Sequence, residues 1–184
     1  MAQRKITQDL IVRQAQALIE EQGFDNFSLR ELAYRLGVQP SSLYNHLKNV
    51  SSLRDAIALL ALEEMQGRIE AAVKDIHGRE ALLRIARTIR TFSQERPELF
   101  RSIESGGRLE ATGAFFAPTK EVLKDFALTE EEKDKFTNAF HAAIFGFLLM
   151  ERRHMLLRAE EADHDFVTMV GLLTSGLRLE RQVN

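Results

Sequence analysis

The sequence predicts an all-α protein with a three-helix N-terminal domain, residues 1–50, and a helical C-terminal domain, residues 51–184. Three observations predict this fold class. Apolar residues recur at spacings of three and four along almost the whole chain, no stretch alternates as a half-buried strand would, and the clearest breaks fall at glycines. A hydrophobic fraction of 45% with 28% charged residues is ordinary for a folded globular protein.

Composition excludes several kinds of protein. The chain has no cysteine, which excludes disulfides, thiolate metal sites and cysteine nucleophiles. The N-terminal residues lack the apolar run of a signal peptide, and the longest apolar stretch, 142–150, is too short to span a membrane. We therefore expect a cytoplasmic protein with no cofactor and no membrane partner.

The first helix is predicted between Thr7, whose hydroxyl suits an N-cap, and Gly23. Phe24 and Phe27 follow it, and we expect both rings to fill the junction with the next helix. The apolar face of this first helix comprises Leu10, Ile11, Ala15, Leu18 and Ile19.

Residues 28–47 predict two short helices joined by a glycine turn. Ser28 and Glu31 have the spacing of a capping box. Gly37 allows the chain to leave the first helix, and Pro40 suits the first turn of the second, where its missing N–H costs nothing. The expected core contacts are Leu29, Leu32, Ala33 and Leu36 on the first helix, and Leu43 and Leu47 on the second. This is the geometry of a helix-turn-helix.

The remaining residues predict further helices in sequence. Asn49 is a natural N-cap for a long helix to about Lys74, and two more helices are expected over 79–95 and 97–105. A loop over 105–113 precedes a helix over 114–124, in which Pro118 lies near the start or causes a kink.

A second capping box, Thr129 with Glu132, opens a long helix that we expect to end near Arg158. The acidic segment 160–165 then links it to a last helix with an apolar face that includes Phe166 and Val170.

The segment from Leu29 to Asn49 has the pattern LxxLAxxLGVxxxxLYxHxKN, which resembles the DNA-binding motif of the TetR (tetracycline repressor) family. The resemblance covers about 45 residues and is limited beyond them to length and helical layout. It implies a homodimeric transcriptional regulator of double-stranded DNA, most often a repressor released from a palindromic operator by a small hydrophobic molecule.

In a helix-turn-helix the second helix enters the major groove with its N-terminal residues nearest the bases. We expect Gln39, Ser41 and Ser42 to read base edges, with Asn45 as a further candidate. The expected contacts to phosphate or sugar are Ser28, Arg30, Tyr44, His46 and Lys48. Pro40 is a further expected DNA-binding residue. Arg4 and Lys5 would form an arm with nonspecific affinity. His46 is equally consistent with a helix-packing role.

Charge is distributed unevenly although the net charge is only −2. Residues 1–54 hold seven basic and five acidic groups, a net charge of +2, whereas the remaining residues have a net charge of −4. A basic N-terminal domain on an acidic body is compatible with DNA binding. A neutral helical hairpin, or an adaptor that binds protein, would share this pattern, and a steep fall of DNA affinity with salt would favour DNA.

Two-fold dimerisation would place two recognition helices about 34 Å apart. We expect the last two helices to form the dimer surface, because glycines there allow close approach of backbones. The candidate interface residues are Phe166, Val170, Gly171, Leu173 and Leu177. The alternative is that these side chains face the core of their own protomer.

Ten of the twelve phenylalanines lie beyond residue 90, and they could line an apolar effector chamber. The candidate ligand-binding residues are Phe92, Phe100, Phe115, Phe140, His141 and Ile144, with Glu104 or Arg108 as a polar partner. The alternative is a packed core, because phenylalanines at helical spacing form either.

An enzyme is the main rival class. Two Glu-x-x-His pairs, Glu151 with His154 and Glu161 with His164, have a spacing that recurs in di-iron helix bundles. Both pairs flank one acidic linker, whereas such bundles place them on separate helices facing inward. We therefore predict a regulator without catalytic or metal-binding residues.

Overall fold

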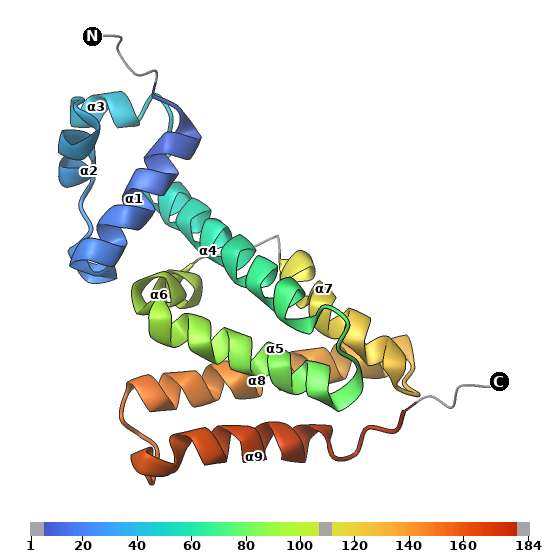
Figure 1. Ribbon diagram of the computed structural model, residues 1–184. Coiled ribbons are helices and arrows are strands. Elements are labelled where there is room, and N and C mark those ends of the chain that lie inside the picture. Colours follow the sequence, from blue (N-terminus) through green and yellow to red (C-terminus); the bar gives the residue numbers. More distant parts are fainter. Residues whose placement is uncertain (1–5, 107–111, 180–184) are drawn as a thin grey trace. The chain divides into compact units, whose positions relative to one another are not determined.

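The computed structural model describes residues 6–106 and 112–179, and the regular elements within these ranges are all helical (Figure 1). The all-α class predicted from the sequence is confirmed. The elements are α1 (Gln8–Gln22), η1 (Phe24–Asn26), α2 (Leu29–Leu36), α3 (Pro40–Leu43), α4 (Val50–Val73), α5 (Gly78–Glu95), α6 (Pro97–Ser105), α7 (Thr112–Val122), η2 (Leu123–Asp125), α8 (Glu130–Arg152), η3 (Ala159–Glu161) and α9 (Ala162–Thr174). Among the described residues, no helix combines the length and apolarity needed to cross a membrane.

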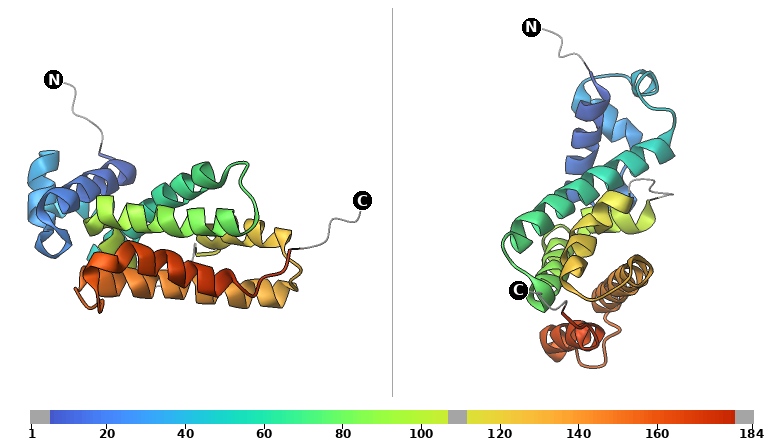
Figure 2. Two further views of the ribbon diagram at one scale, coloured as in Figure 1. Left: turned by 60° about the horizontal axis from the view of Figure 1, so that its bottom comes forward. Right: turned by 90° about the vertical axis from the view of Figure 1, so that its right-hand side faces the viewer.

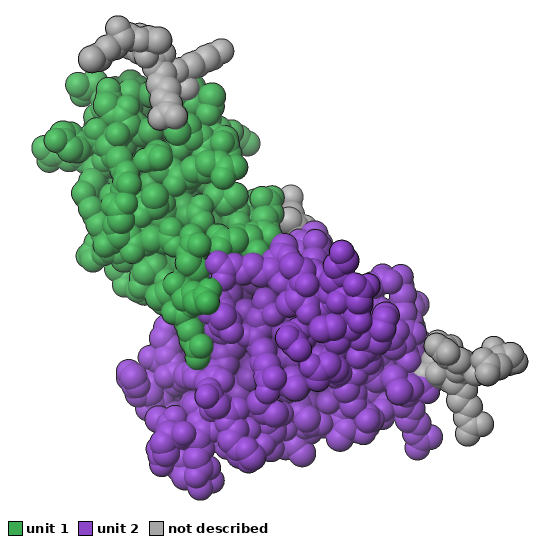
Figure 3. Space-filling model, in the orientation of Figure 1, with its two compact units in different colours: residues 1–64, 94–111 green, residues 65–93, 112–184 purple. Residues whose placement is uncertain are grey.

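The chain divides into two compact units (Figure 3). Unit 1 comprises residues 1–64 and 94–111, and unit 2 comprises residues 65–93 and 112–184. The division differs from the predicted boundary at residue 50, because α4 contributes to both units and α6 belongs to the N-terminal one.

Unit 1 is organised around α1, which packs against α2 and α6. The Thr7 hydroxyl accepts a hydrogen bond from the Leu10 N–H at 3.2 Å, so the predicted N-cap is present. Gly23 ends the helix with a positive φ of 91°, which an L-residue rarely adopts. The buried face is Ile11, Val12, Ala15, Leu18 and Ile19, with Leu10 only half-buried.

Unit 2 contains α5, α7, α8 and α9, and α8 lies beside α9 (Figure 2). Thr129 and Glu132 form the predicted capping box at the start of α8. Arg90 of α5 joins the helices: its guanidinium pairs with Glu151 of α8 at 2.6 Å and with Asp163 of α9 at 2.7 Å. It also lies 5.1 Å from the centre of the Phe166 ring.

The helix α8 ends at Arg152, six residues before the predicted end. His154 adopts a left-handed φ of 54°, and the Met155 N–H donates to the Met150 carbonyl at 2.9 Å. This is a Schellman-type C-cap with histidine where glycine is usual. At the other side, Ala162 to Asp165 belong to α9, so the predicted linker is largely helical.

Candidate nucleic-acid interface

The first helix of the motif, α2, is fixed at both ends. The Ser28 hydroxyl accepts a hydrogen bond from the Glu31 N–H at 3.3 Å, which is one half of the predicted capping box. The Glu31 carboxylate instead accepts from the side chain of Gln22. Gly37 ends α2 in the left-handed region, with φ 69° and ψ 32°, and the Val38 N–H donates to the Ala33 carbonyl at 3.0 Å.

The second helix, α3, is shorter than predicted. It comprises Pro40 to Leu43, after which turns continue the chain as far as Leu47. The His46 and Leu47 N–H groups both donate to the Leu43 carbonyl, at 2.9 and 3.0 Å. Leu43 and Leu47 are buried as predicted, so this segment is held to the core of unit 1 by the two leucines.

The side chains predicted to meet DNA surround this anchor. Tyr44 is 55% exposed, and the Gln39 side chain makes no capping hydrogen bond although Gln39 occupies the N-cap position of α3. Ser42 is half-buried. The other predicted contact residues are all exposed: Ser28, Arg30, Gln39, Pro40, Ser41, Asn45, His46 and Lys48. The structure therefore leaves these polar groups available to a partner, whereas Arg4 and Lys5 lie outside the described residues.

Tyr34 is a candidate that the sequence reasoning missed. Its ring is 87% exposed on α2, an unusual position for a large aromatic side chain. It lies four residues after Arg30, so both project from one face of the helix. The signal in the sequence was its position outside the apolar stripe of this helix.

The two ends of the interface are stabilised differently. Arg35 of α2 forms a bidentate pair with Glu21 of α1, both contacts at 2.7 Å, and its hydrogen bond lowers the pKa of the Glu21 carboxyl. Asn49 caps α4 as predicted, accepting from the Ser52 N–H at 2.7 Å. Lys48 therefore directly precedes the positive end of a long helix, where a phosphate is favoured.

Comparison with known proteins identifies this N-terminal unit. Residues 11–57 match the family described as bacterial regulatory proteins, tetR family, and these residues include the whole helix-turn-helix. The helix-turn-helix of this chain is therefore a TetR-family DNA-binding segment. The chain is a DNA-binding transcriptional regulator, as the motif predicted.

Similarity to known proteins extends along most of the chain. The protein is 26% identical to the HTH-type transcriptional regulator Rv0681 of Mycobacterium tuberculosis, over 94% of this chain and 82% of that one. The fold matches TetR of Acinetobacter baumannii with its ligand minocycline, at a TM-score of 0.72 and 22% identity over 94% and 96% of the two chains. It also matches BioQ with its double-stranded DNA operator, at a TM-score of 0.68 and 17% identity over 93% and 99%.

The predicted interface residues on α9 divide into two groups. Phe166 and Val170, and Leu177 beyond the helix, are buried in the core of unit 2, so the prediction fails for these three because their own protomer covers them. Leu173 is half-buried and Gly171 is exposed. The exposed residues of α8 and α9 include several small and apolar ones: Ala139, Ala142, Gly146, Leu149, Met150, Gly171 and Leu172.

The predicted ligand-binding residues are distributed between the two units. Phe100 and Glu104 belong to unit 1, and Arg108 lies outside the described residues. In unit 2 the rings of Phe115, Phe140 and His141 pack together, with His141 4.9 Å from Phe115 and 5.7 Å from Phe140. Phe92 and Ile144 are buried as well.

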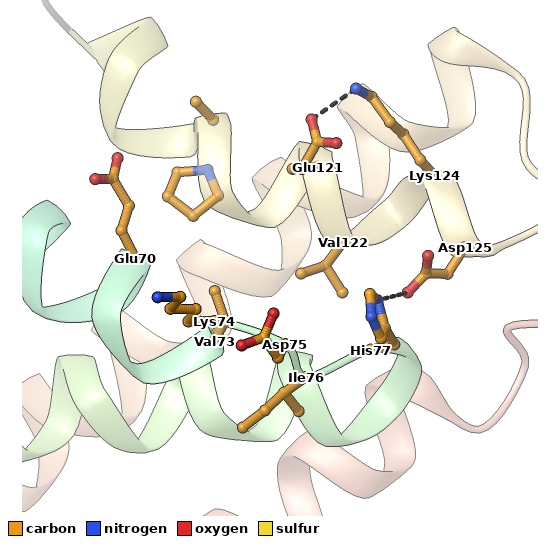
Figure 4. A pocket seen from close by; sticks show the side chains of 12 residues that line it. Glu70, Val73, Lys74, Asp75, Ile76, His77, Glu121, Val122, Lys124 and Asp125 are labelled. Carbon is orange, nitrogen blue, oxygen red and sulfur yellow. Dashed lines mark hydrogen bonds and ion pairs between the residues drawn. The ribbon is translucent and has the colours of Figure 1, made fainter.

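A groove of about 460 Å³ lies elsewhere in unit 2 (Figure 4). Val73 at the end of α4, Ile76 in the loop after it and Val122 of α7 supply apolar lining, and Figure 4 shows Lys74 and Asp75 beside them. The Nδ1 of His77 lies 3.7 Å from the Oδ2 of Asp125 on the same side. The groove has the size of a small-molecule site.

The two Glu-x-x-His pairs do not form a metal centre. Glu151 accepts two hydrogen bonds from Arg90, and Glu161 pairs with Arg158 at 2.8 Å. His154 lies beyond the end of α8, so it does not share a helical face with Glu151 as the Glu-x-x-His spacing predicted. Within residues 6–106 and 112–179, no three His, Asp or Glu side chains are grouped to hold a metal.

Proposed function

We propose that this regulator is a homodimeric repressor that binds a palindromic operator and is released from it by a small hydrophobic effector. The observation that supports it best is the polar surface around α3. Its side chains are exposed while Leu43 and Leu47 hold the backbone in place. We place its action in the cytoplasm, where operator DNA is accessible.

The small DNA contact area of a single helix-turn-helix favours a dimer. A single helix-turn-helix reads one major-groove segment, which is too small an interface for high specificity. The exposed stripe on α8 and α9 supports a two-fold contact, because a Cβ built at Gly146 or Gly171 would meet no other atom within 4 Å. Leu172, which is 71% exposed, supplies apolar area to such a contact.

Effector release needs only a modest coupling free energy. A difference of about 1–3 kcal/mol in effector affinity between DNA-competent and incompetent states changes operator affinity roughly 5- to 150-fold. We propose the groove beside Val73 and Val122 as the effector site, because it combines apolar lining with a volume that suits a small molecule. The groove lies at the end of α4, the helix whose first part belongs to unit 1.

The test is selection of bound fragments from random DNA duplexes by the full-length protein. A two-fold symmetric consensus is expected, with an affinity that falls steeply between 50 and 200 mM salt because phosphate contacts release counterions. Gln39→Ala should relax selectivity at one base pair, whereas Lys48→Ala should weaken all duplexes equally. Recovery of no consensus, or an affinity independent of salt, would refute DNA reading.

Effector binding is tested separately. Hydrophobic compounds that raise the unfolding temperature are assayed for release of the selected operator. Val122→Trp, which fills the groove, should abolish the response and leave operator affinity unchanged. A response that persists in this variant would place the effector elsewhere.

A further inference from the structure

Three charged side chains, Arg96 at the N-cap of α6 and Glu98 and Arg101 within it, hold the N-terminal helices of unit 1, although α6 begins more than 50 residues beyond the recognition helix α3 in sequence. We propose that Arg96, Glu98 and Arg101 are positioning residues for DNA binding, fixing α1 and η1 so that the helix-turn-helix is presented in one orientation. This inference rests on the proposed reading of an operator.

Glu98 makes the most specific of these contacts. Its Oε2 accepts a hydrogen bond from the backbone N–H of Phe24 at 2.6 Å. Phe24 begins η1, and its preceding residue, Gly23, has no side chain that could cap the helix. Glu98 therefore supplies this cap from a distant segment. Because a backbone N–H bonded to a carboxylate is a charge-assisted contact, it restricts the chain at the entry to the motif strongly.

Arg101 and Arg96 extend the same attachment. The Arg101 guanidinium donates to Asp25 of η1 at 2.6 Å and to Glu98 at 3.3 Å, and the bond to Asp25 raises the pKa of Arg101. Arg96 pairs with Glu20 of α1 and, at 3.0 Å, with Glu64 of α4. One arginine thus ties α6 to the helix before the motif and to the helix after it.

Packing fixes the far end of α6. A Cβ built at Gly106 would lie 3.1 Å from the Cβ of Ala58 on α4, so α6 ends in close contact with that helix. α1, η1 and α4 flank the motif in sequence, and apart from the Arg101–Glu98 contact within α6 the hydrogen bonds of the three charged residues go to these elements. Within the described part of the chain none of their partners belongs to α2 or α3, which separates positioning from direct DNA contact.

The test compares Glu98→Ala with Glu98→Gln. Both changes remove one negative charge, so their nonspecific attraction to DNA changes equally, but only glutamine retains an acceptor for the Phe24 N–H. We expect Glu98→Ala to bind the selected operator about fivefold more weakly than Glu98→Gln, the net effect of losing one neutral hydrogen bond. Binding to a random duplex should be the same in both variants.

Glu80→Ala is the matched control. Glu80 is an exposed acid of α5 that pairs with Arg84 at 3.3 Å, in unit 2. Its removal changes the charge as Glu98→Ala does and should leave operator affinity within twofold of the wild type, since exposed helix pairs contribute little.

Amide hydrogen exchange provides a readout that needs no DNA. The Phe24 N–H should exchange faster in Glu98→Ala than in Glu98→Gln. Faster exchange with equal operator affinities in the two variants would overturn the positioning role while DNA binding stands. Loss of binding to both the operator and the random duplex in Glu98→Ala would also overturn the positioning role, because that result means that unit 1 is unfolded. If the wild-type protein selects no sequence, the proposed function itself fails.

Discussion

Acid should destabilise unit 2 through one buried histidine. His141 is only 4% exposed, its Nε2 lies 2.9 Å from the Thr119 hydroxyl, and Nδ1 has no partner among the described residues. Burial lowers its pKa from 6.5 to about 4. The ring is therefore neutral in the folded protein at pH values where the unfolded chain binds a proton.

The sign of the effect follows from linkage. Below pH 6.5 the unfolded state binds more protons than the folded state, so stability falls as pH falls and stops falling near pH 4. Each unit of pKa difference corresponds to about 1.4 kcal/mol. The shift of His141 therefore predicts a loss of about 3 kcal/mol in the free energy of unfolding between pH 7 and pH 4.

Urea denaturation of wild type and His141→Gln at fixed protein concentration, from pH 7 to pH 4, measures this loss. The variant should lack this component of the pH dependence. His164→Gln, which changes an exposed histidine of α9, should keep the wild-type slope. The reasoning is refuted if His141→Gln and wild type lose stability in parallel, or if the His141 ring titrates near pH 6.5 by NMR.

Four further substitutions test the framework of the fold. Thr129→Ala should lower the free energy of unfolding by about 1 kcal/mol in thermal or urea melts, because the N-cap of α8 is lost. Arg90→Gln should cost about 3 kcal/mol by the same assay, because Arg90 is 12% exposed and its loss leaves Glu151 without a counter-charge. Gly37→Ala should destabilise by about 1 kcal/mol because φ there is 69°, whereas Gly67→Ala, in the interior of α4 with open space around it, should stabilise by a similar amount.

Local signals in the sequence predicted the helices well. Thr7, Asn49 and Thr129 begin helices as expected, because an N-cap satisfies backbone groups within three residues of itself. The apolar periodicity placed Leu43 and Leu47 correctly in the core. The features that depend on a single helix and its caps could therefore be predicted from the sequence.

Features that depend on distant partners were not visible. The side chain of Glu31 accepts a hydrogen bond from Gln22 and does not complete the capping box with Ser28. The helix α8 ends early because His154 adopts a left-handed conformation, which is uncommon for histidine and could not be predicted from its residue type. Phe166 and Val170 form an apolar face that serves the protomer's own core as well as it would serve a partner. Hydrophobic spacing identifies a buried face and leaves the identity of the covering surface open.

The predicted domain boundary at residue 50 shows the same limit. Chain order places α6 in the regulatory half, but Glu98 and Arg101 bind residues 24 and 25, and Arg96 binds residues on both sides of the motif. The sequence does not indicate which distant residue a charged surface side chain pairs with. These ion pairs and hydrogen bonds could therefore be found only from the structure. α6 follows α5 directly in the chain. A displacement of α5 would therefore be transmitted through the backbone to α6, the helix that contacts α1 and η1. Regulation therefore need not act on the recognition helix itself.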